Sequence, residues 1–243
     1  MKLFNYTKEG KGVSKNEAQA PAIVRFFKAF GRNFWKIIVL NIVYLFACAP
    51  IITIGPATAG FTYVMRNLSQ GKPVDMFADF FAKAKENFLK GIVIELINAA
   101  LIALSVYAFF AWTGTGMEVP SWLRTVAIFV LIWVAYIFVC ANFYIFPMMV
   151  SFDLKLKQLI RNSIILGMYK LGPNILMIVV NLAVIGVCFI TWPSSLAIIL
   201  TLPFGACNFF NNFVIYPVLV KHVATPVEEP EINEEDIVFK DTH

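Results

Sequence analysis

The chain has 243 residues, of which 59% are hydrophobic and only 14% are charged. A water-soluble domain carries about 25% charged residues, so this chain has too few charges to cover a water-facing surface. The net charge of +5 does not indicate nucleic acid, because the basic residues flank apolar runs and form no polar domain. We therefore predict an all-α, polytopic transmembrane bundle in a lipid bilayer, with no nucleic-acid partner.

Residue types that bind metals or perform nucleophilic catalysis are scarce or scattered. Both histidines, His222 and His243, lie near the C-terminus, and the four cysteines are spread through apolar runs without paired spacing. The sequence contains no nucleophile elbow, phosphate-binding glycine loop or paired acidic cluster. We expect no enzymatic activity, no metal and no cofactor.

Residues 1–32 are predicted to form a cytoplasmic N-terminal segment that includes an amphipathic helix. The stretch APAIVRFFKAFGRNF places its apolar side chains on one helical face and its basic side chains away from that face. Residues 76–90 and 154–170 have a similar character. Helices of this kind lie in the headgroup region of a membrane or dock a cytoplasmic partner, and both interpretations remain open.

Residues 33–222 are predicted to form the transmembrane helical domain. Crossing about 30 Å of hydrocarbon needs roughly 20 residues in a helix. Four apolar runs are long enough, at residues 91–112, 122–150, 171–192 and 196–220, and a fifth begins at Phe34. The fifth run continues into the unusual stretch CAPIITIGPATAGFTYVM, residues 48–65.

Prolines and glycines interrupt this stretch. Pro50 disfavours continuation of the first helix, while Gly55 and Pro56 favour the start of a new one. The return arm is short, so part of the IITIG backbone is predicted to lie in the membrane in a non-helical form. Such backbone needs burial in protein or a wet cavity, and Thr53, Thr58 and Thr62 could supply hydrogen bonds. A structural kink and a ligand- or ion-binding element both fit.

The predicted topology depends on whether the chain reverses direction within residues 48–65 and crosses the membrane a second time. With this reversal, the chain has six membrane segments arranged as three hairpins, and 19 of the 20 Lys and Arg residues lie on one side. With five plain spans, the basic groups fall on opposite sides. Lys and Arg concentrate in cytoplasmic loops, so we favour six segments with both termini cytoplasmic.

A short repeat relates the last two hairpins. The segments ANFYIFPMMV and NNFVIYPVLV, 70 residues apart, align Asn142 with Asn212 and Pro147 with Pro217. This spacing favours a common ancestry of the two hairpins, and each proline is expected to kink the last cytoplasmic turn of its helix.

Few polar residues lie within the spans. Glu95 is the only carboxylate in a predicted span, and Asn98 follows one turn later. An intramembrane carboxylate is a candidate proton or cation site, although Glu95 is close enough to Lys90 to lie at the cytoplasmic interface. The asparagines either hydrogen-bond between helices or line a polar substrate path.

Residues 223–243 are acidic and interrupted by prolines. This composition predicts a disordered cytoplasmic tail or a peptide that a partner recognises.

Three segments of the first 90 residues resemble the YesL family of small bacterial membrane proteins. These are the N-terminal stretch MKLFNYTKEGKGVSKNEAQ, the core PIITIGPATAG at residues 50–60, and the aromatic belt at residues 79–88. The resemblance implies a bacterial cytoplasmic membrane protein without established activity, often encoded beside carbohydrate ABC importers. No site residue can be transferred from it.

We therefore predict a non-enzymatic accessory protein of a carbohydrate ABC uptake system, with importer subunits as partners. The alternatives are an autonomous small transporter or channel, and a membrane sensor or assembly scaffold. The permease motif E-A-A…G is absent from residues 75–90 and 153–170. The sequence leaves the substrate, the partner's identity and the oligomeric state open.

Overall fold

The computed structural model describes residues 21–114, 119–191 and 201–223. Within these ranges every regular element is a helix, as predicted. The elements are α2 (Ala22–Ala47), the 3₁₀ helix η1 (Ile51–Thr53), α3 (Ile54–Gln70), α4 (Met76–Glu86), α5 (Phe88–Thr113), α6 (Ser121–Met149), α7 (Leu156–Tyr169), α8 (Leu171–Ile190) and α10 (Pro203–His222). The predicted N-terminal segment before residue 21 and the predicted tail after residue 223 lie outside the described residues.

Helix α2 joins the predicted amphipathic segment to the first apolar run. It continues without a break through residue 32, where the sequence suggested a domain boundary. Phe26 contacts the rings of Phe209, Phe210 and Phe213 in α10, with centroids 5.4–5.9 Å apart. Part of the amphipathic face therefore packs inside the protein, while Phe27 stays exposed.

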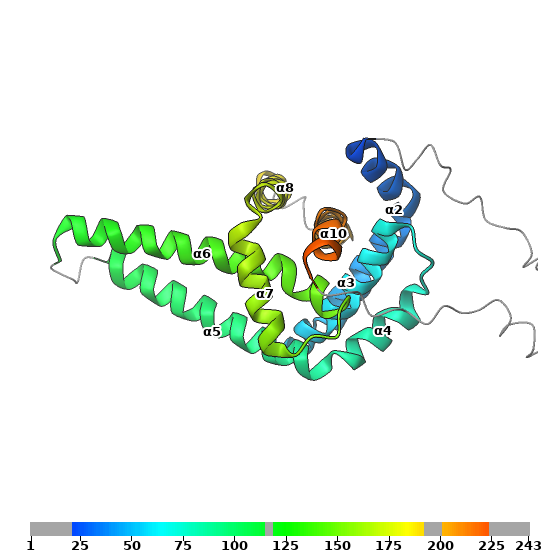
Figure 1. Ribbon diagram of the computed structural model, residues 1–243, viewed down its shortest axis with the longest axis horizontal. Coiled ribbons are helices and arrows are strands. Elements are labelled where there is room, and N and C mark those ends of the chain that lie inside the picture. Colours follow the sequence, from blue (N-terminus) through cyan, green and yellow to red (C-terminus); the bar gives the residue numbers. More distant parts are fainter. Residues whose placement is uncertain (1–20, 115–118, 192–200, 224–243) are drawn as a thin grey trace, which may run out of the picture.

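Helix α3 is the most buried of the described helices and lies beside α2 and α4 (Figure 1). Thirteen of its 17 residues are buried, and it contacts α2, α4, α5, α6 and α10. Small residues make this possible, because a helix can approach closely only where side chains are short. A Cβ on Gly60, for example, would overlap the carbonyl oxygen of Phe80 in α4.

The two shorter amphipathic helices fold back along the helices that precede them. Asp75 caps α4 by accepting a hydrogen bond from the backbone N–H of Ala78 at 3.1 Å, and α4 then packs against α3. Helix α7 packs against α6, where a Cβ on Gly167 would lie 3.2 Å from the backbone nitrogen of Ala141. Each amphipathic helix thus buries one face in the protein itself.

Four described helices are long and apolar enough to cross a membrane: α2, α5, α6 and α8. Helix α3 has only 17 residues, and α10, which contains three asparagines and a lysine, also falls outside this set. Among the residues described, four helices thus meet the criterion, against the five to six segments predicted.

The hairpins are not arranged as one parallel bundle. Helices α5 and α6 project together across the view of Figure 1, whereas α8 and α10 are seen end-on. Membrane helices are tilted on average by about 20° and up to about 40°. The two pairs therefore do not share one membrane normal in this arrangement, and the predicted arrangement of five to six membrane segments as three hairpins is not confirmed.

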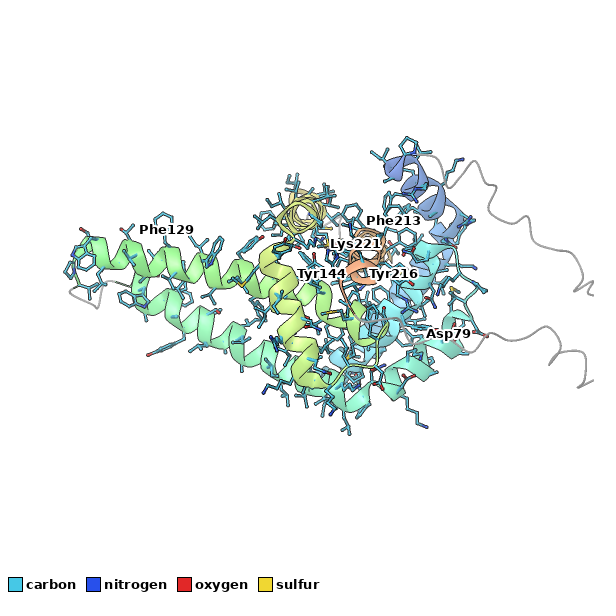
Figure 2. All side chains as sticks on the ribbon, in the orientation of Figure 1. Asp79, Phe129, Tyr144, Phe213, Tyr216 and Lys221 are labelled. Atoms are coloured by element: carbon cyan, nitrogen blue, oxygen red, sulfur yellow. The ribbon has the colours of Figure 1, made fainter. Side chains whose placement is uncertain are left out.

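Apolar side chains cover the outer parts of the long helices. Phe129 of α6 points away from its helical partner (Figure 2) and is 69% exposed, and Phe110 of α5 and Leu182 of α8 are also exposed. Soluble monomers rarely expose large contiguous apolar surfaces. Together with the four apolar helices, this surface indicates an integral membrane protein.

Candidate functional site

The break between α2 and α3 differs from its prediction. Residues 51–53 form a 3₁₀ turn that leads directly into α3, so the IITIG segment is largely helical. The tip is also exposed, with Ile51 at 79%. The exposed tip makes local hydrogen bonds, and the Thr53 hydroxyl is 2.6 Å from the carbonyl oxygens of both Ala47 and Pro50.

Gly55 and Pro56 serve close helix packing. Helix α3 begins at Ile54, so they are its second and third residues. A Cβ on Gly55 would overlap the Gly91 carbonyl of α5, and a Cβ on Gly91 would lie 2.6 Å from the nitrogen of Pro56. The Thr58 hydroxyl donates to the Ile54 carbonyl at 2.7 Å. These contacts support the structural-kink interpretation of the break.

Glu95 and Asn98 face different neighbours. Glu95 is partly buried beside the hairpin tip, with its Cβ 3.2 Å from the position a Gly55 Cβ would take. Asn98 instead donates to the Oδ1 of Asn142 in α6 at 2.8 Å. The structure therefore does not gather these residues into a single polar site.

The asparagines of the last two hairpins mostly link helices. Asn142 pairs with Asn98 across α5 and α6, and Asn181 donates to Asn211 across α8 and α10 at 2.9 Å. Asn212, the residue aligned with Asn142, instead bonds within its own helix to Asn208. The aligned asparagines thus share one contact, because each amide donates to the backbone carbonyl four residues earlier, but Asn142 also pairs with Asn98 of another helix.

The two aligned prolines also differ in their surroundings. Pro147 is buried near the end of α6, whereas Pro217 is exposed within α10. Both helices continue past the proline, so neither proline ends its helix.

A cavity of about 280 Å³ lies between α5, α6 and α7. Asn98, Asn142 and Ser105 are its polar lining residues, and the other eight lining residues are apolar. Because the two asparagine amides bond to each other, this cavity offers a mainly apolar surface.

A cavity of about 710 Å³ lies where α3, α4, α5, the end of α6 and α10 meet, and we call it the basic cavity. Its charged lining consists of four cations and two carboxylates: Arg66, Lys72, Lys83, Lys90, Glu86 and Asp153. The lining therefore carries net positive charge. Tyr63 and Tyr216 complete two of its walls, and Figure 2 shows Tyr216 on α10 near the centre of the molecule.

Arg66 is the buried cation of this cavity. Its Nη1 donates to the backbone oxygen of Val150 at 3.0 Å and to the Ser151 hydroxyl at 2.8 Å, and its Nε and Nη2 donate to Asn67 Oδ1. The last carbonyls of a helix lack partners within the helix, and Val150 is the C-cap of α6. Arg66 thus fastens the end of α6 to α3, and the ring of Tyr63 stacks on its guanidinium at 4.8 Å.

The two lysines on α4 and α5 are held at the cavity wall. Lys83 forms an ion pair with Glu86 at 2.7 Å and lies 5.1 Å from the centre of the Tyr63 ring. Lys90 donates to the backbone oxygen of Leu154 at 3.2 Å and lies 3.9 Å from Asp153. Both side chains are only partly exposed, at 30% and 40%.

Sequence reasoning missed the basic cavity. Its cations are spread over residues 66–90 and were interpreted only as topology signals. The nearest sequence signal is Arg66 itself, which is the only charged residue of α3. Its partners Val150 and Ser151 lie 84 and 85 residues further along the chain.

One family model matches the chain, over residues 37–109, and its description is "Protein of unknown function, DUF624". The matched segment includes α3, α4 and the four cations of the basic cavity. No curated protein and no solved structure matches the chain. Over residues 37–109, the chain is therefore similar to a family without an assigned function.

Proposed function

We propose that this chain is a non-enzymatic protein of the bacterial cytoplasmic membrane that assists a carbohydrate ABC uptake system. In this proposal it belongs to the YesL family, and both termini and the basic cavity face the cytoplasm. The resemblance of the first 90 residues to the YesL family supports a carbohydrate ABC importer as the partner. The basic residues around α3, α4 and α7 support the orientation, because Lys and Arg concentrate on the cytoplasmic side.

The outward faces of α4 and α7 are the observation that carries an adaptor role. Each helix buries one face against α3 or α6, yet its other face exposes apolar side chains. These are Phe77 and Phe81 on α4, and Ile165 and Met168 on α7. Exposed lysines lie beside them at residues 85 and 157. An apolar face bordered by cations suits contact with another membrane protein at the membrane boundary.

The internal polar residues favour the same conclusion. Those singled out in the sequence mainly bond to one another or to the backbone of their own helices. A transport path needs polar groups that face a shared passage. In the first hairpin, the hydroxyls of Thr53 and Thr58 instead bond to nearby backbone carbonyls.

A pull-down tests this role. Tagged protein is recovered from its native host in mild detergent, and bound proteins are identified by mass spectrometry. We expect importer permeases to be recovered with the native chain and to be lost with the double variant Phe77→Ser/Phe81→Ser. The control is Phe129→Ser, on the outer part of α6, which should retain them. Recovery of the chain alone, or as a homo-oligomer, would contradict the accessory role.

The basic cavity favours a second candidate, an autonomous transporter of a small anion. Reconstitution into liposomes separates the two roles. Anion flux that the purified chain supports by itself, and that Lys83→Gln removes, would replace the accessory role with transport.

A further inference from the structure

We propose that the basic cavity is a binding site for a phosphoryl group, carried either by a lipid headgroup or by free phosphate. The proposal does not depend on the importer role. It rests on the net charge of the lining, the donors that face the cavity and the position of the cavity at the ends of apolar helices.

Charge is the first argument. Two carboxylates among four cations leave the cavity electropositive, and the buried member, Arg66, is only 4% exposed. An electropositive lining attracts anions, and the attraction is stronger where the cations are shielded from water.

Donor chemistry is the second argument. A lysine ammonium has three donors, and the contacts of Lys83 and Lys90 described above occupy only some of them. The hydroxyls of Tyr63 and Tyr216 add neutral donors to the lining residues. Hydrogen bonds from ionised donors to phosphate are about twice as strong as neutral ones. Lys72, at the same cavity, completes a set of cations drawn from α3, α4, α5 and the turn after α3.

Position is the third argument. Lys90 is the third residue of α5, and Val150 is the C-cap of α6. Both helices are of membrane length, so their paired ends mark a boundary of the apolar part of the hairpin. Lipid phosphates lie at that level in a bilayer. The volume of about 710 Å³ is within the range of small-molecule sites and has room for more than the phosphoryl group alone.

Arg66 also has a structural role as the partner of the α6 end, so its removal could unfold the protein. The test therefore uses the lysines. The cavity variant is Lys83→Gln/Lys90→Gln. The matched control is Lys85→Gln/Lys157→Gln, which removes the same charge from exposed positions on α4 and α7 outside the cavity lining.

Two arms distinguish the sources of the phosphoryl group. In the first, equilibrium dialysis with radiolabelled inorganic phosphate is performed on the full chain in neutral detergent. In the second, native mass spectrometry counts phosphatidylglycerol retained by the chain after release from phosphatidylcholine nanodiscs that contain it as a minor component. Each lost lysine is expected to weaken binding by about tenfold, and the control pair should bind like the native chain.

Saturable binding in the first arm identifies a soluble phosphate site, and retention only in the second arm identifies a headgroup site. In either case the cavity variant must lose the ligand. Equal loss in the cavity and control variants would show that only the net charge of the surface matters, and it would overturn the proposal. Absence of binding in both arms would overturn it as well.

Discussion

Replacement of Gly91 by alanine should destabilise the protein by forcing α5 away from α3. The new Cβ would lie 2.6 Å from the nitrogen of Pro56, 2.8 Å from the carbonyl carbon of Gly55 and 3.0 Å from the Cα of Pro56. All three are backbone atoms, which cannot rotate aside. Ordinary contact needs at least 3.4 Å, so the two helices must separate by about 0.8 Å.

The expected loss follows from two opposing effects. Overpacking of a well-packed contact costs about 1–3 kcal/mol, while alanine favours a helix interior over glycine by up to about 1 kcal/mol. We expect a net loss of about 1–2 kcal/mol in the free energy of unfolding. Titration with sodium dodecyl sulfate in mixed micelles, followed by circular dichroism, measures it.

Gly186→Ala is the matched control for this substitution. Gly186 is also inside a membrane-length helix, α8, but a Cβ there would meet nothing within 4 Å. This variant should gain about 0.5–1 kcal/mol. If Gly91→Ala were as stable as Gly186→Ala, the close crossing of α3 and α5 would be refuted.

Three further substitutions test other contacts by the same titration. Thr53→Val removes the hydroxyl that bonds the hairpin tip and should cost about 1 kcal/mol, whereas an unchanged stability would show that the tip does not need it. Asn98→Leu breaks the amide pair with Asn142 and should cost about 0.5–2 kcal/mol; a gain in stability would contradict that pair. Arg66→Gln removes the charged donors at the end of α6 and should cost about 1.5–3 kcal/mol, and a loss below about 1 kcal/mol would mean that the arginine does not hold α6.

The helical class and most of the long helices could be predicted from composition and hydropathy. A run such as residues 122–150 is too long and too apolar for any other structure, and α6 spans residues 121–149. The position of the break between α2 and α3 could also be predicted from its residues. Pro50 and Gly55 correctly located the break, because their effect on the backbone depends only on neighbouring residues.

Features that depend on contacts between distant residues were not predictable. The backbone of Gly55 packs against that of Gly91 in another helix, and no local sequence pattern predicts this contact. The same holds for α7, which an amphipathic pattern places equally well on a membrane or on α6. The basic cavity needs α3, α4 and the end of α6 to meet, so hydropathy cannot show it.

The shape of the hairpin tip was mispredicted for a specific reason. Counting residues from Pro56 made the return arm too short to span, which called for non-helical backbone. The actual helix α3 starts earlier, at Ile54, and extends to Gln70. The Thr53 hydroxyl bonds to the Ala47 carbonyl within this exposed tip.

We propose that the basic cavity of this membrane protein opens toward the cytoplasm. The most direct test is the labelling of a single cysteine, Lys72→Cys, at the cavity wall, with the four native cysteines replaced. In intact cells of the native host, a membrane-permeant maleimide should label this cysteine and an impermeant maleimide should not. Labelling by the impermeant reagent in intact cells would place the cavity outside and contradict the account.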